Sequence, residues 1–141
     1  MPANVQPIYT RLPDVQWTVS AMTTANTTKD LTAGTIYLAF TADSTNGSYV
    51  QRIRFRPLGT NSNATVARVW INNGSATTTA SNNTLFDEIT LPTITNIETA
   101  AQSNYELPLN FGLNPGYRIY VTVGTAPTSA GWNATVIGGD Y

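Results

Sequence analysis

The chain has 141 residues, a net charge of −1, and neither cysteine nor histidine. This length predicts a single domain that folds without a disulfide or a metal. The missing residues exclude a disulfide scaffold, a cysteine nucleophile and a zinc–thiolate site, and they remove the commonest general base. The near-neutral charge argues against a nucleic-acid partner, and the lack of a long apolar run argues against a transmembrane helix.

The first 14 residues carry three prolines and show no hydrophobic period. Because proline removes a backbone donor and fixes φ, residues 1–14 are predicted to form an extended arm before a folded domain of residues 15–141. Two interpretations stay open for the arm: a disordered tail, or an arm that lies on a neighbouring subunit. A Sec signal peptide is not expected, because the start is not basic and no apolar segment follows it.

Eight short stretches after the arm have the composition and spacing of β-strands. Turn signals separate some of them, such as Asn46-Gly47 and Asn114-Pro115-Gly116. Pro108 predicts an edge or a bulge, because proline cannot donate a hydrogen bond to a ladder. The predicted strands are residues 15–21, 35–42, two runs within 49–72, and then 84–91, 103–111, 117–123 and 132–137.

The fold class follows from these strands, because no helical period of useful length appears among them. Short strands with turns between them predict an all-β domain, either an antiparallel sandwich or a barrel. About eight strands with long crossing loops favour a jelly-roll-like β-sandwich over an immunoglobulin-type domain.

Residues 49–72 contain the clearest candidate surface. Two alternating runs flank a polar break at residues 59–63, and the simplest interpretation is a β-hairpin. In the first run one face carries Tyr49, Gln51, Ile53 and Phe55, and the other carries Val50, Arg52, Arg54 and Arg56. In the second run one face carries Ala67, Val69 and Ile71, and the other carries Val66, Arg68 and Trp70. The hairpin would have one apolar face and one arginine face, made of Arg52, Arg54, Arg56, Arg68 and Trp70.

The arginine face needs neutralising partners. Like charges opposite each other cost roughly 0.2–1 kcal/mol, and a guanidinium stacked on an indole returns about 0.5–1 kcal/mol. The carboxylates would come either from this chain, where Asp87, Glu88 and Glu106 are candidates, or from a partner. We therefore predict an interface, with a merely solvated outer face of the sandwich as the alternative.

No catalytic, cofactor-binding or metal-binding residue is expected, and the chain is predicted not to be an enzyme. Glycoside hydrolysis needs two convergent carboxylates, whereas Asp87 and Glu88 are adjacent in a strand and point to opposite faces. The loop at Asp43 lacks the further acids of a calcium site and is interpreted as a turn. Tryptophan and tyrosine side chains suit a sugar platform, but aromatics at alternating strand positions are more often core residues.

The runs DLTAGTIYLAFTADSTNGSYVQRIRFRPLGTNSNATVARVWINNG, NNTLFDEITLP, LPLNFGLNPGYRIYVTVG and GWNATVIGGDY resemble small virion accessory proteins of tailed bacteriophages, in particular capsid decoration (cement) proteins. The resemblance spans about residues 30–141 and lies in the strand and turn pattern. It implies a homotrimeric jelly-roll protein on the capsid surface of the virion, bound to the major capsid protein, with no cofactor and no nucleic-acid or membrane partner. The alternative is a receptor- or glycan-binding domain of a phage head or tail fibre.

Overall fold

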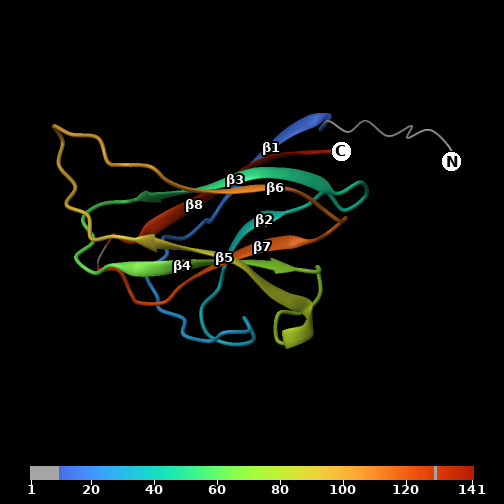
Figure 1. The fold of residues 1–141 in the computed structure, drawn as a ribbon, viewed down its shortest axis with the longest axis horizontal. Coiled ribbons are helices and arrows are strands. Elements are labelled where there is room, and N and C mark those ends of the chain that lie inside the picture. The colour runs from blue at the N-terminus through green and yellow to red at the C-terminus, as the bar shows by residue number, and fades with distance from the viewer. Residues whose placement is uncertain (1–9, 129) are drawn as a thin grey trace, which may run out of the picture.

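Eight strands form two four-stranded antiparallel sheets that pack face to face (Figure 1). This arrangement is seen in a computed structural model, which describes residues 10–128 and 130–141, so most of the predicted arm lies outside the described residues. The predicted all-β sandwich of eight strands is confirmed. In the described part of the chain no helix is long and apolar enough to cross a membrane.

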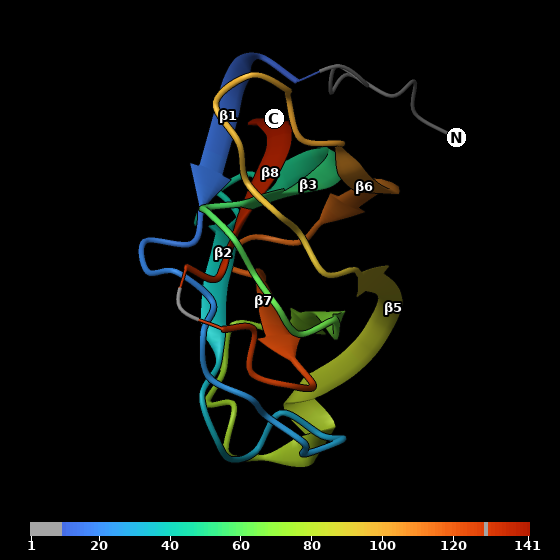
Figure 2. The ribbon, with the colours of Figure 1, turned by 90° about the vertical axis from the view of Figure 1, so that its left-hand side faces the viewer.

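Each sheet combines strands that are far apart in the sequence. Sheet I has the order β1 (Leu12–Trp17), β8 (Trp132–Asp140), β3 (Ser48–Pro57) and β6 (Tyr105–Leu113). Sheet II has the order β2 (Tyr37–Thr41), β7 (Arg118–Val123), β4 (Thr65–Asn72) and β5 (Asn83–Leu91), with a 3₁₀ turn, η1 (Ala80–Asn82), before β5. This alternation between two sheets is the strand order of a jelly roll. Figure 2 shows β1 above β2 on one side of the sandwich and β6 above β5 on the other.

The core lies between the sheets and is built by the inward positions of the alternating strands. Its largest fully buried side chains include Phe55 of β3 and Trp132 of β8 in sheet I, and Val69 of β4 in sheet II. Two boundaries differ from the sequence prediction. β1 begins at Leu12, inside the predicted arm, and β8 runs on to Asp140, because Leu12 and Asp140 pair with each other.

The predicted hairpin of residues 49–72 is wrong. β3 pairs with β8 and β6 in sheet I, whereas β4 pairs with β5 and β7 in sheet II. The polar break between the two runs is a crossover anchored by the fully buried Asn61, whose backbone pairs with Ile94. The Asn61 side chain also donates to the carbonyl of Gly131 at 2.9 Å and accepts from its N–H at 2.8 Å. These long-range hydrogen bonds hold the crossover against distant parts of the chain. A polar residue in a tight turn would not need them.

A bulge at Gln51 changes which side chains of β3 share a face. Along β8, Val50 pairs with Gly138 and Arg52 pairs with Ile137, so Gln51 is an extra residue. An extra residue shifts the two-residue period by one, and this puts Val50 in the core with the later inward residues of β3. The prediction that Gln51 shares a face with the core residues of β3 is therefore wrong. The edge or bulge predicted at Pro108 is confirmed, because β6 is an edge strand and its pairing with β3 shifts register there.

Candidate functional site

The outer faces of the two sheets differ in how they are covered. Residues 18–36, drawn blue to cyan in Figure 1, run beneath sheet II, where Leu31 packs on Trp70 and Tyr120. Among the described residues, no further strand or helix lies over the outer face of sheet I. Within the part of the chain that the structure describes, apolar side chains of that face such as Val15 and Trp17 are exposed.

Strand register places apolar and basic side chains side by side on this face of sheet I. One row across the sheet reads Trp17, Thr135, Arg54 and Glu106, and the next reads Val15, Ile137, Arg52 and Pro108. Neighbouring strands lie about 4.8 Å apart, so Trp17 and Val15 are roughly 10 Å from the arginines of their rows. Trp17 is 56% exposed and Val15 is 47% exposed. We call these two rows, with Arg56, the sheet I face.

Two of the three arginines on the sheet I face share one carboxylate, and the third contacts only neutral acceptors. Nε of Arg54 lies 2.5 Å from Oε1 of Glu106, while Nη1 of Arg52 lies 3.7 Å from Oε2. Nη1 of Arg56 donates to the carbonyl of Gln102 at 2.9 Å and to Oδ1 of Asn104 at 2.7 Å, which are neutral acceptors. The three cations and one carboxylate leave an excess of two positive charges, in a chain whose net charge is −1.

Two hollows lie next to each other on the outside of sheet I. The larger, of about 400 Å³, is lined by Gln51, Arg52, Glu106, Pro108 and Asn110. The smaller, of about 220 Å³, is lined by Thr10, Tyr49, Gln51, Ile137 and Gly138. Gln51 lines both, and the hydroxyl of Tyr49 lies 3.4 Å from Oδ1 of Asn110. The bulge thus turns Gln51 outward, where it lines both depressions.

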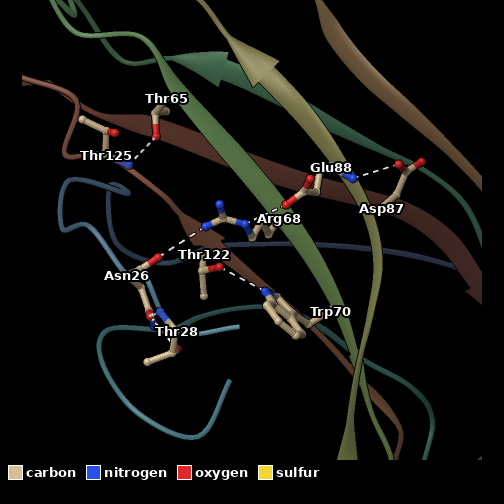
Figure 3. Close-up of polar contacts among 9 residues, drawn as sticks. All are labelled: Asn26, Thr28, Thr65, Arg68, Trp70, Asp87, Glu88, Thr122 and Thr125. Carbon is tan, nitrogen blue, oxygen red and sulfur yellow. Dashed lines mark hydrogen bonds and ion pairs between the residues drawn. The ribbon is translucent and has the colours of Figure 1, made fainter. Parts of the chain in front are cut away.

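Arg68 and Trp70 do not belong to this surface, which corrects the predicted arginine face. Both lie on the covered side of sheet II (Figure 3). Nε of Arg68 lies 2.7 Å from Oε1 of Glu88, Nη1 reaches the carbonyl of Asn26 at 3.5 Å, and only 11% of the side chain is exposed. Trp70 is 1% exposed, and its Nε1 donates to Oγ1 of Thr122 at 3.0 Å. Arg68 and Trp70 hold the 18–36 segment on the sandwich instead of reaching outward.

The carboxylates predicted as arginine partners are likewise divided between the two sheets. Glu106 and Glu88 do pair with arginines, as predicted, each in its own sheet. Asp87 instead accepts the backbone N–H of Glu88 at 2.8 Å. Hydrogen bonds lower the pKa of two other carboxyls below 3.8: those from Thr32 act on Asp30, and those from Asn46 and Thr45 act on Asp43. These are turn-stabilising contacts, and they confirm Asp43 as a turn residue.

Sequence reasoning missed Trp17 and Val15 as surface residues, because alternation does not indicate which face of this strand is exposed and aromatic residues at alternating positions are more often core residues. β1 is an edge strand, and its Val15–Trp17 side turns outward. The described residues include no group of three or more histidine, cysteine, aspartate or glutamate side chains placed to hold a metal ion. The sheet I face presents an exposed indole, an aliphatic strip and guanidinium groups.

Comparisons with protein-family models, with curated proteins and with solved structures find no match to this chain.

Proposed function

We propose that this protein is a structural component of a tailed-phage virion, a decoration protein that binds and stabilises the outer capsid surface through its sheet I face. The observation that carries the proposal is the exposed Trp17 on the same face as three arginines that have only one carboxylate among them, Glu106, which contacts Arg54 and Arg52. Trp and Arg are the side chains that most often dominate the binding energy of protein interfaces. The partner surface is acidic with apolar patches. Its acidic groups match the positive excess of the sheet I face, and its apolar patches match Trp17, Val15 and Ile137.

Two further considerations support this choice. The jelly roll is an architecture that recurs in viral capsid and lectin domains, although a fold alone does not fix a function. The second is the resemblance of residues 30–141 to phage decoration proteins. A decoration protein needs a surface that binds the capsid. The sheet I face combines exposed apolar side chains with arginines, which suits such binding.

The test is quantitative mass spectrometry of purified particles of the phage that encodes the chain. A decoration protein is present in many copies per particle, a fibre domain is present in few, and absence from the particle contradicts the proposal. Particles decorated with Trp17→Ala or Arg54→Ala protein should show reduced occupancy. Arg118→Gln, an arginine of β7 in sheet II, is the matched control and should bind normally.

We also propose that the protein is a homotrimer, as the resemblance implies. The edge strand β5 supports self-association, because it exposes Leu85 and Phe86 on the other sheet from the sheet I face. Light scattering measures the molar mass of the free protein directly. A monomer at micromolar concentration would contradict a trimer in solution.

The second candidate is a glycan-binding domain of a head or tail fibre. The observation that favours it is the smaller hollow beside Tyr49, whose ring offers a stacking surface next to the amide of Gln51. A glycan array separates the two candidates. Binding that Tyr49→Ala abolishes would support the fibre domain, whereas no glycan binding together with high copy number on particles supports decoration.

A further inference from the structure

The larger hollow on sheet I contains a positive charge that this chain balances only in part. Oε1 of Glu106 is held by Arg54 at 2.5 Å, and Oε2 lies 3.7 Å from Arg52, beyond hydrogen-bonding range. Within the described residues Arg52 donates no hydrogen bond, and its Nε is enclosed without an acceptor. A guanidinium has five donor hydrogens, so Arg52 has unused capacity for an anionic acceptor.

The backbone around Arg52 departs from regular strand geometry in two ways, a shift in strand register and a positive φ. The pairing of β3 shifts register beside Arg52 against both of its neighbours, β8 and β6. Asn110, opposite the bulge, has a φ of 54°, a conformation that non-glycine residues rarely adopt. Bulges and such conformations re-aim side chains and gather at binding sites. Here they bring Gln51 and Asn110 to the hollow around Arg52.

We propose that this hollow binds a carboxylate, supplied by an aspartate or glutamate side chain of a partner protein, with Arg52 as the main donor. The guanidinium fork matches a carboxylate through two parallel hydrogen bonds. The source of the carboxylate rests on the proposed function, in which the partner is the capsid. Among the described residues, this larger hollow is lined by no aromatic ring on which a sugar could stack, and the aliphatic strip of Val15 and Ile137 leads up to Arg52. These features favour a protein side chain over an acidic sugar.

The site can be tested without the capsid by NMR titration of the purified protein with sodium acetate, glucuronate and glucose. The probes are the Nε–H resonance of Arg52 and the side-chain amides of Gln51 and Asn110. Acetate should shift all three saturably, glucuronate should do so no more strongly than acetate, and glucose should not. Arg52→Gln should weaken acetate binding by roughly tenfold or more, because a hydrogen bond to a charged group contributes at least that factor.

Three further variants sharpen the result. Arg52→Lys keeps the charge but loses the fork, so its affinity for acetate should fall between those of the wild type and Arg52→Gln. Glu106→Gln should bind acetate more tightly, because it removes a negative charge at the edge of the hollow that repels the acetate. Arg118→Gln should leave the titration unchanged.

Two outcomes would overturn the proposal. Equal shifts at Arg52 and Arg118 would mean that no site exists, and saturation by glucose, or by glucuronate alone, would assign the hollow to a sugar. Acetate binding that depends on Arg52 supports the site whatever the copy number on virions. Failure of the proposed function and failure of this site are therefore distinguishable.

Discussion

Replacing Glu106 by Gln tests how the sheet I face is held together, because it removes the charge and keeps the size. A hydrogen bond between charged groups contributes about 1.5–3 kcal/mol when it is shielded from water. Glu106 and Arg54 are 30% and 36% exposed, so solvent screening reduces this to about 1 kcal/mol. For a chain of 141 residues this corresponds to a fall of about 3 °C in the melting temperature.

The assay is a pair of double-mutant cycles followed by thermal unfolding at low and high salt. The Arg54–Glu106 cycle should give a coupling of about 1 kcal/mol that shrinks at high salt, and the Arg52–Glu106 cycle should give a coupling near zero. The difference follows from the 2.5 Å and 3.7 Å distances. An equal or larger coupling for Arg52 would refute this reasoning, because it would mean that Glu106 neutralises Arg52 and that the hollow has no free charge.

Three other variants address the rest of the fold. Arg68→Gln should lower the free energy of unfolding by about 1–2 kcal/mol, because it releases Glu88 and the 18–36 segment; an unchanged urea midpoint would argue against that role. Gly138→Ala should destabilise by more than about 2 kcal/mol, because its Cβ would overlap the carbonyl of Tyr49 in β3; wild-type melting would contradict this packing. Asp43 has a pKa below 3.8 in the folded protein, so its contribution is complete above that pH and is lost as the pH falls through the lowered value. The stability difference between wild type and Asp43→Asn should shrink in that acidic window, and a constant difference down to pH 2 would count against the turn contacts.

Local chemistry in the sequence accounts for the strands and the turns. The alternation of β4 puts Ala67 and Val69 in the core as predicted, because the two-residue period of a strand belongs to the backbone itself. The turn at Asn114-Pro115-Gly116 also follows from local chemistry: Gly116 has a φ of 75°, and the N–H of Tyr117 donates to Asn114. The sequence likewise determined the absence of thiol and imidazole chemistry, which depends on composition alone.

The candidate site depended on contacts between residues that are far apart in the sequence. Alternation does not say which strand pairs with which, so Arg52 and Arg68 were placed on one face although they lie in different sheets. The alternation of residue types also gives no sign of a bulge, so the outward position of Gln51 could not be predicted. Trp17 and Trp70 illustrate this: Trp17 is exposed because no described strand or helix covers its face of sheet I, and Trp70 is buried because a distant segment covers it. Burial is decided by what packs against a side chain, and only the tertiary structure determines that.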